Sequence, residues 1–172
     1  IGDVLLDEYL IGQAKRISRE APIPVLEFES RQLIPGGAAN PACNIAALGS
    51  HPVQIGAIGA DAPAHTLRRV LADKGIATDG LVTDPTRPTT VKLRVMAQMG
   101  LRFPQQVARL DTLSREPIST EVEQAALDRI QPHLKQAQAS LFSDYHGGFL
   151  TPTLVETVRD LCRAAGILLT AD

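Results

Sequence analysis

Apolar runs and segments of helical period alternate along this chain. Short apolar runs bounded by turn residues predict strands at residues 1–6, 53–58, 140–143 and 167–170, with a weaker strand at 81–83. Between them, apolar positions recur at helical spacing and predict helices at 39–48, 61–75, 120–137 and 151–166. This alternation favours an α/β fold with a mainly parallel central sheet flanked by helices.

Two segments, at about residues 13–34 and 89–111, break the alternation because both are rich in β-formers and have no helix between their strands. In the second, residues 89–96 predict a strand, 98–104 a turn and 106–110 a returning strand. We expect the two segments to form a small separate sheet beside the main one. Residues 1–172 are interpreted as belonging to one domain.

Helix boundaries are marked by local signals. Glycines are expected to end three of the helices, and Thr151-Pro152 has the cap-then-proline pattern of a helix start. Thr120 and Glu123 have the spacing of a capping box, which predicts that Thr120 caps the third helix. Pro132 lies inside that helix and predicts a kink or a break.

Composition narrows the function classes. The formal net charge of -2 argues against a nucleic-acid surface, and no apolar run of about 18 residues predicts a membrane span. Cys43 and Cys162 are interpreted as reduced core residues, as in a cytoplasmic protein. The four histidines lack metal-ligand spacing with cysteine, so no metal site is expected. The chain also lacks the phosphate loop of P-loop kinases and the glycine pattern of dinucleotide sites.

Residues 35–49 are the strongest candidate for a binding site. Gly36 and Gly37 would let a ligand approach the backbone, and the helix that follows offers free N–H groups at its start. Asn40 can donate and accept hydrogen bonds, which suits a sugar hydroxyl. The alternative is an ordinary Pro-Gly-Gly turn closed by a buried helix.

Asp7 follows the first predicted strand, at the end where open α/β sheets bind ligands. Its carboxylate could accept hydrogen bonds from two sugar hydroxyls, or it could be a solvated aspartate at a strand end. Asp3 is interpreted as structural, a partner for backbone N–H groups. Asp144 follows another predicted strand and is a further candidate for sugar binding.

Three basic residues could bind a phosphate group. Lys92 and Arg94 alternate with apolar residues and therefore share one face of their strand, and Arg109 lies on the returning strand. A guanidinium can bind two phosphate oxygens at once. The alternative is the solvated face of an edge strand, where lysine discourages aggregation.

The Gly-Gly-x-x-Asn pattern with its small-residue helix, and the run Gly2–Tyr9, resemble the ribokinase-like (PfkB) family of sugar kinases. Four further blocks resemble its heptose 7-phosphate kinase branch, the kinase domain of ADP-heptose synthases; they are Arg16–Val25, Thr90–Val95, Arg109–Asp111 and Ser143–Tyr145. The resemblance implies a ribokinase-like fold with a β lid, residues 13–34 and 89–111, over the sugar site. It also implies ATP and Mg²⁺ as cofactors and a homodimer through the lid.

On this resemblance, the sugar contacts are Asp7, Gly36, Gly37, Asn40 and Asp144, and the phosphate contacts are Lys92, Arg94 and Arg109. The family's Gly-Ala-Gly-Asp segment with the catalytic base is absent, so no catalytic residue is assigned here. We therefore expect the N-terminal, sugar-binding portion of a longer polypeptide.

The expected activity is phosphorylation of a heptose 7-phosphate at its anomeric hydroxyl. Gly147 stands where the heptose kinases have lysine, which puts in doubt a charge near the transferring phosphates. His146, beside it, is interpreted as a surface residue. Two alternatives stay open: a non-catalytic module that binds a sugar phosphate, and another PfkB-type kinase such as a fructokinase or ribokinase.

Overall fold

The computed structural model describes residues 1–100 and 103–172, which form eight strands and four helices. The N-terminal elements are β1 (Val4–Ile17), β2 (Pro24–Gly37), α1 (Ala39–Ala47), β3 (Gly56–Ile58), α2 (Ala62–Ala72) and β4 (Leu81–Thr83). The C-terminal elements are β5 (Val91–Gln98), β6 (Gln105–Thr112), α3 (Thr120–Leu134), β7 (Ala139–Phe142), α4 (Pro152–Ala165) and β8 (Leu168–Ala171). The turn expected at 98–104 includes residues 101 and 102, which lie outside the described residues.

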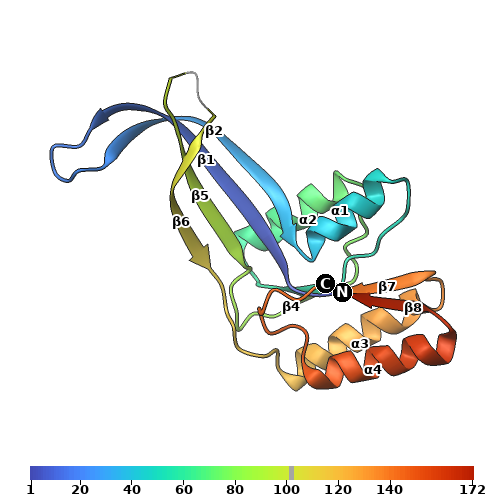
Figure 1. Cartoon of the computed structure of the whole chain (residues 1–172). Coiled ribbons are helices and arrows are strands. Elements are labelled where there is room, and N and C mark those ends of the chain that lie inside the picture. Colours follow the sequence, from blue (N-terminus) through green and yellow to red (C-terminus); the bar gives the residue numbers. More distant parts are fainter. Residues whose placement is uncertain (101–102) are drawn as a thin grey trace.

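A parallel layer forms the body of the molecule. β3 pairs with β4 and β7 with β8, both in parallel. The segment just before β1 joins the two pairs, because Gly2 bridges to Ser143 in parallel and donates its N–H to the carbonyl of Ile55 at 3.1 Å. The resulting order, β4-β3-β1-β7-β8, is the mainly parallel sheet expected from the sequence. Helices α1 and α2 lie on one side of this layer, and α3 and α4 on the other (Figure 1).

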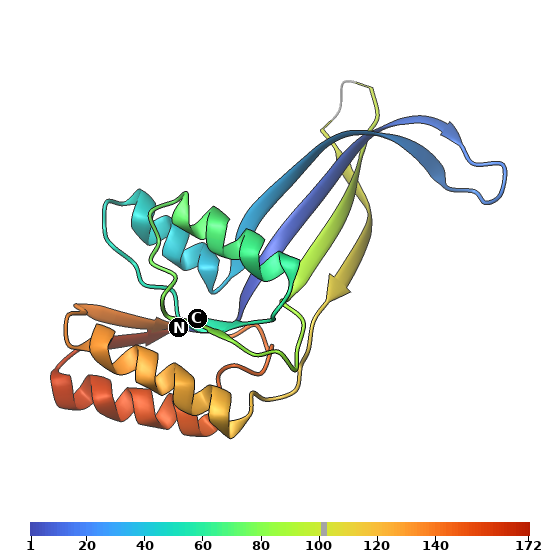
Figure 2. The ribbon, with the colours of Figure 1, turned by 180° about the vertical axis from the view of Figure 1, so that it is seen from behind.

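A second, four-stranded sheet with the order β2-β1-β5-β6 projects from the body (Figures 1 and 2). It contains the two β-rich segments of the sequence. β1 pairs with β2 antiparallel and with β5 parallel, and β6 returns antiparallel to β5. The sequence predicted a strand that ends at Leu6, whereas β1 continues to Ile17. The two sheets therefore share one long strand, because pairing with β2 and β5 extends it.

Two hydrophobic clusters hold the helices in place. Val4 and Leu6 of β1 pack with the alanines of α1 and with Leu67 and Leu71 of α2. On the other side of the layer, Ile130 of α3 and Val158 of α4 belong to a separate cluster. The valine, leucine and isoleucine side chains of these two sets are at most 3% exposed, so burial of apolar area is the main force that fixes the helices on the sheet.

The predicted capping box is wrong. Ser119, not Thr120, is the N-cap of α3, and its hydroxyl accepts from the N–H of Val122 at 3.4 Å. Glu123 instead accepts a hydrogen bond from the hydroxyl of Thr151, the N-cap of α4. α3 also continues without a break through Pro132 to Leu134. A proline this close to the end removes one hydrogen bond of the last turn, a loss that the packed helix tolerates.

Candidate functional site

The face of the projecting sheet that turns away from α1 and α2 carries two rows of polar side chains. Registered partners on neighbouring strands share a face, and Val4 and Leu6, on the other face, contact the helices. The first row runs Ile34, Asp7, Lys92, Asp111 across the strands, and the second runs Gln32, Tyr9, Arg94, Arg109. Strand pairing thus gathers four sequence-predicted residues, Asp7, Lys92, Arg94 and Arg109, on one surface.

Asp7 and Arg94 form an ion pair between the two rows. The Arg94 guanidinium donates to Asp7 Oδ1, and both side chains are less than one fifth exposed. Arg94 also lies over the ring of Tyr9, 5.2 Å from its centroid. Burial by itself would lower the pKa of Arg94, but the hydrogen bond and charge of Asp7 raise it above its ordinary value. Arg94 thus holds one oxygen of the Asp7 carboxylate in place.

Gly36 lies directly against the other oxygen of Asp7. A Cβ at Gly36 would overlap Asp7 Oδ2 and would lie 2.5 Å from Leu5 Cδ1. Gly36 is the registered partner of Leu5 at the end of β2, so the glycine pair and Asp7 belong to the same corner of the sheet. The absence of a side chain at Gly36 is what allows the carboxylate to lie there.

Lys92 lies beside a small cleft of about 110 Å³. Its ammonium group is 5.4 Å from the ring centroid of Tyr145, a cation–π contact. Arg109, Arg115 and His146 also line the cleft. Among the residues that the structure describes, Lys92 has no carboxylate partner within ion-pair distance. The cleft is also lined by Asp3 and Asp111, but Asp111 pairs with Arg109 and Asp3 binds backbone N–H groups, so Lys92 is a cation without an ion pair among the described residues.

Arg109 differs from Lys92 because it is already paired. Its guanidinium binds both carboxylate oxygens of Asp111, at 2.9 and 3.0 Å. The geometry is bidentate, the form in which arginine holds a carboxylate most strongly. Of the three predicted phosphate contacts, Arg94 and Arg109 each have a carboxylate partner, whereas Lys92, within residues 1–100 and 103–172, contacts the Tyr145 ring and forms no ion pair.

Asp3 holds the loop that carries Asp144 and Tyr145. Its carboxylate is buried and accepts from the backbone N–H groups of Tyr145, Gly147 and Phe149 at 3.0 to 3.1 Å. Asp3 thus has a structural role, as expected from the sequence, but the N–H groups it binds belong to the loop after β7 and not to the Gly36-Gly37 turn where the sequence placed them. Because it satisfies three N–H groups, the loop keeps a fixed shape beside the cleft.

The other predicted site residues lie around this surface rather than within it. Asp144 is exposed and accepts a hydrogen bond from the N–H of His146 at 2.8 Å. Gly37 has a φ of +60° and packs against the carbonyl of Asp3. Asn40 is exposed on the first turn of α1, and in the described part of the chain no hydrogen bond connects it to Asp7 or to the basic residues. The structure therefore brings Asp7 and Gly36 into contact, and the role of Asn40 stays a prediction.

Sequence reasoning missed three residues at this site. Tyr145 and Asp111 belong to the blocks that resemble heptose kinases, but the sequence assigned neither of them a role. The signals that could have identified them are an aromatic residue next to Asp144 and an acidic residue two positions after Arg109. Arg87 was also missed, although its guanidinium makes three hydrogen bonds next to the cleft. An isolated Arg-Pro dipeptide in a loop gives no local sign of such contacts.

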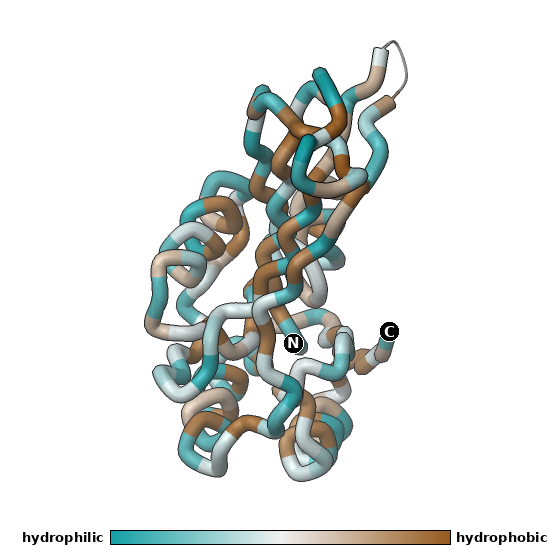
Figure 3. Tube along the Cα trace, turned by 90° about the vertical axis from the view of Figure 1, so that its left-hand side faces the viewer, coloured by the Kyte–Doolittle hydropathy of each residue, from teal (hydrophilic) through white to brown (hydrophobic). Residues whose placement is uncertain are grey.

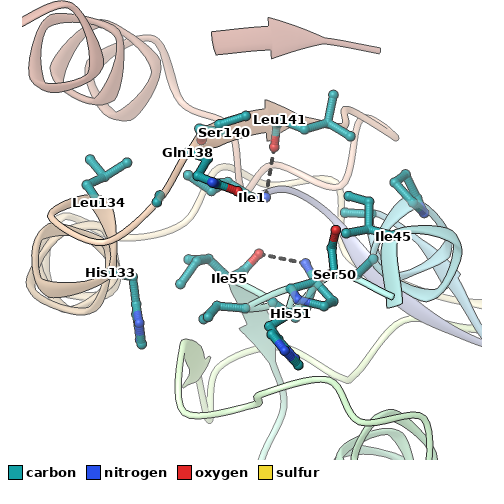
Figure 4. Close-up of a pocket in the computed structure, with 18 of the residues that line it drawn as sticks. Ile1, Ile45, Ser50, His51, Ile55, His133, Leu134, Gln138, Ser140 and Leu141 are labelled. Carbon is teal, nitrogen blue, oxygen red and sulfur yellow. Dashed lines mark hydrogen bonds between the residues drawn. The ribbon is translucent and has the colours of Figure 1, made fainter. Parts of the chain in front are cut away.

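A larger cavity, of about 840 Å³, lies elsewhere and contains none of the predicted site residues. Figure 4 shows it between the starts of β3 and β7, with Ile55 on one side and Leu141 on the other. The amino group of Ile1 lies in it and donates to the carbonyl of Leu141 at 2.9 Å. Open α/β sheets bind ligands at the opposite, carboxyl ends of their strands, so we assign this cavity no ligand.

Metal ligands do not gather at this surface. In residues 1–100 and 103–172, no group of three or more His, Cys, Asp or Glu side chains could hold a metal ion. No residue of this chain is assigned as a ligand of Mg²⁺, and no step of a reaction is assigned to the ion here. No helix in the same residues is long and apolar enough to cross a bilayer.

Comparisons with known proteins show the family and the fold that this chain resembles. A model of the pfkB family carbohydrate kinases matches residues 1–169. The Bifunctional protein HldE of Nitrobacter hamburgensis is 40% identical over 166 residues, which cover 96% of this chain and 33% of that protein. The chain thus spans about a third of the length of the curated relatives it matches.

Two solved structures show the same fold at low identity. Phosphofructokinase-2 from Escherichia coli, in complex with fructose-6-phosphate, has a TM-score of 0.65 and 18% identity, and the match covers 99% of this chain and 52% of that one. Ribokinase from Arabidopsis thaliana, complexed with ribose and ATP, has a TM-score of 0.61 and 17% identity, with 99% and 51% covered. The α/β fold is thus that of sugar kinases, as expected from the sequence.

Proposed function

The chain belongs to the pfkB family of carbohydrate kinases, and on that premise we propose that it forms the sugar-binding part of an ATP-dependent kinase for a heptose 7-phosphate. The proposed reaction adds a phosphoryl group to the anomeric hydroxyl. The substrate assignment follows from the sequence blocks that resemble heptose 7-phosphate kinases. The observation that supports it most directly is the unneutralised Lys92 ammonium beside a cleft on the same face as Asp7.

Asp7 is proposed to bind sugar hydroxyls. A carboxylate that is held by Arg94 on one oxygen keeps further lone pairs free to accept hydrogen bonds. Gly36 leaves room beside the second oxygen. Gly37, Asn40 and Asp144 are proposed as additional sugar contacts at the margin of the site. Fixing the sugar in one orientation is what a kinase needs before phosphoryl transfer.

Lys92 is proposed to bind the phosphate that the substrate already carries. Arg94 and Arg109 would contribute positive potential, but their carboxylate partners Asp7 and Asp111 offset much of it. Lys92 is free of such a partner in the described residues, and Tyr145 holds its ammonium toward the cleft. This division of roles makes Lys92 the main phosphate contact.

ATP is the proposed phosphoryl donor, with Mg²⁺ as its counter-ion. Support comes from the family and from the related ribokinase that was solved with ribose and ATP. When bound, the nucleotide would supply the group that is transferred, and Mg²⁺ would neutralise its phosphates. The residues of this chain are assigned only the binding and orientation of the sugar.

A phosphorylation assay on the full-length protein tests the proposal. The substrates are a heptose 7-phosphate, the same heptose without phosphate, fructose 6-phosphate and ribose, with release of ADP as the readout. We expect turnover of the heptose 7-phosphate above the others, and loss of turnover in Asp7→Asn. Binding of the heptose 7-phosphate without turnover would favour the non-catalytic module, and preferred turnover of another sugar would favour a different branch of the family.

The projecting sheet is also proposed to form a homodimer. It exposes large apolar side chains, among them Phe28 at 71% and Leu110 at 63% exposure. Figure 3 shows hydrophobic stretches along these strands, away from the helical body. Apolar side chains in such a position are typical of an interface. Sedimentation equilibrium tests this: the wild type should dimerise and Phe28→Lys should not, whereas a monomeric wild type would refute it.

A further inference from the structure

We infer that Arg87 is a positioning residue for the phosphate cleft. Its guanidinium connects the base of the β5–β6 hairpin, which carries Lys92, to the loop that carries Tyr145, and so fixes the contact between the Lys92 ammonium and the Tyr145 ring. Only the expected effect on phosphate binding rests on the proposed function. The connection itself can be tested without any substrate.

Three nitrogen atoms of the Arg87 guanidinium each have a partner. Nε donates to Asp84 Oδ2 at 2.9 Å, Nη1 to the carbonyl of Gly147 at 3.0 Å and Nη2 to the carbonyl of Glu116 at 2.9 Å. The Arg87 side chain is 10% exposed and that of Asp84 is 2% exposed. Three hydrogen bonds from one buried cation leave it a single orientation.

The partners of Arg87 lie on three separate segments. Asp84 precedes β5, and Glu116 follows β6, so both ends of this hairpin are attached to the same guanidinium. Gly147 belongs to the loop after β7, two residues beyond Tyr145. Lys92 lies at the start of β5, only five residues after Arg87. The two members of the cation–π pair are therefore each a short stretch of backbone away from Arg87.

Asp3 completes the arrangement from the other side of the loop. It binds the N–H of Gly147, whose carbonyl binds Arg87. The loop is thus held on both sides: its N–H groups bind the Asp3 carboxylate, and the carbonyl of Gly147 binds the Arg87 guanidinium. Gly147 fits because a Cβ there would lie 2.7 Å from Asp3 Oδ1. The loop cannot move toward or away from Lys92 without breaking one of these charged hydrogen bonds.

Only arginine fits this role. Lysine has a single donor atom on a flexible stem, and it cannot reach three acceptors that lie around a planar group. The substitution Arg87→Lys therefore keeps the charge and removes the geometry. Arg68→Lys is a matched control, because Arg68 also binds two backbone carbonyls, those of Thr78 and Leu81, but in a region away from the cleft.

Hydrogen–deuterium exchange in the full-length protein provides a direct readout. Asp3 accepts from the N–H groups of Tyr145, Gly147 and Phe149, so exchange at these three amides, followed by mass spectrometry of the peptide that contains them, reports on the position of the loop. We expect Arg87→Lys to speed exchange at these amides. Arg68→Lys should leave it unchanged.

Binding of a heptose 7-phosphate, measured by calorimetry, gives the functional consequence. Arg87→Lys should weaken it about five-fold, the size of a lost cation–π contact, and should leave the unphosphorylated heptose unaffected. Unchanged exchange at these loop amides in a folded Arg87→Lys protein would overturn the inference. Faster exchange with no phosphate binding even in the wild type would uphold the connection and refute the proposed function.

A milder variant covers the case in which Arg87→Lys does not fold. The Thr86 hydroxyl and N–H both donate to Asp84 Oδ1, so Thr86→Val loosens the carboxylate that faces Arg87. Faster exchange at the same loop amides is expected, at smaller amplitude. Its absence in a folded Thr86→Val protein would count against the inference in the same way.

Discussion

Arg94 and Asp7 form an ion pair across two parallel strands although 87 positions separate them in the sequence. Because of this pair, the predicted phosphate contacts Arg94 and Lys92 are expected to have different roles. Arg94 supports the carboxylate proposed to bind the sugar, and Lys92, two residues before it on the same strand face, remains available to a phosphate. Their functions should therefore separate on mutation.

Lys92→Ala should weaken binding of a heptose 7-phosphate by about 10- to 100-fold, the range of a charged hydrogen bond. Binding of the unphosphorylated heptose should stay within about two-fold, because no sugar hydroxyl is assigned to Lys92. Calorimetric titration of both ligands measures the difference. Lys135→Ala, which removes an exposed cation at the end of α3, is the control. Equal losses for the two ligands would contradict the assignment of Lys92.

Arg94→Ala should weaken both ligands by a similar factor, about ten-fold, because the Asp7 carboxylate loses the partner that orients it. The same titrations measure this, and the folded state is checked by the melting temperature. A loss confined to the phosphorylated ligand would mean that Arg94 leaves Asp7 to bind the substrate phosphate. That result would restore the simpler model in which all three cations surround the phosphate.

Gly36→Ala should abolish sugar binding, with a loss of at least about 100-fold. The new Cβ would occupy the position of Asp7 Oδ2 and press on Leu5, so the carboxylate must move. Gly75→Ala is the control: that glycine has a φ of +73° and open space around it, so the change strains the backbone at the end of α2 without approaching the site. Retained binding in Gly36→Ala would show that Asp7 does not hold the sugar.

Local signals predicted the helix ends well. Thr151 with Pro152 does begin a helix, and Gly166 ends it in the left-handed conformation. Each of these features depends on hydrogen bonds between residues a few positions apart, so the sequence contains the whole cause. Ser119 and Thr120 are adjacent and either hydroxyl could cap α3. The capping-box spacing to Glu123 pointed to Thr120, but Ser119 is the N-cap.

Long-range pairing could not be predicted in the same way. The pattern indicated that Lys92 and Arg94 share a face, but not that Asp7 faces them from β1. That neighbour is set by strand register, which depends on packing of Val4 and Leu6 against α1 and α2. The length of β1 escaped prediction for the same reason, since pairing on both sides keeps a strand extended beyond its own apolar run.

Acid should destabilise the protein through Asp61 and Asp84. Burial alone would raise the pKa of each carboxyl, but hydrogen bonds to Asp61 from Thr89 and Ala64, and to Asp84 from Thr86 and Arg87, bring the pKa below its usual value. The folded state therefore gains stability above the pKa of an unfolded aspartate, about 4. That gain is lost as the pH falls through the lower folded pKa values.

Urea unfolding between about pH 6 and pH 3 measures this dependence. The free energy of unfolding of the wild type should fall with decreasing pH. Asp84→Asn should be less stable than the wild type near pH 6, and its free energy of unfolding should depend less steeply on pH. Gln131→Ala, which changes an exposed and uncharged side chain on α3, should keep the wild-type slope. A wild-type slope in Asp84→Asn would mean that this carboxyl does not contribute to the acid transition.

Thr151 connects two helices and should be more important than an ordinary cap. Its hydroxyl accepts from the N–H of Leu154 at 3.1 Å and donates to Glu123 of α3. Thr151→Ala should lower the free energy of unfolding by about 2 kcal/mol, because it removes the cap and leaves a partly buried carboxylate without its donor. Thr151→Ser keeps the hydroxyl and should retain most of the stability. When Glu123→Ala is already present, the cost of Thr151→Ala should shrink to that of a cap alone, about 1 kcal/mol. An undiminished cost would show that the contact between α3 and α4 contributes nothing.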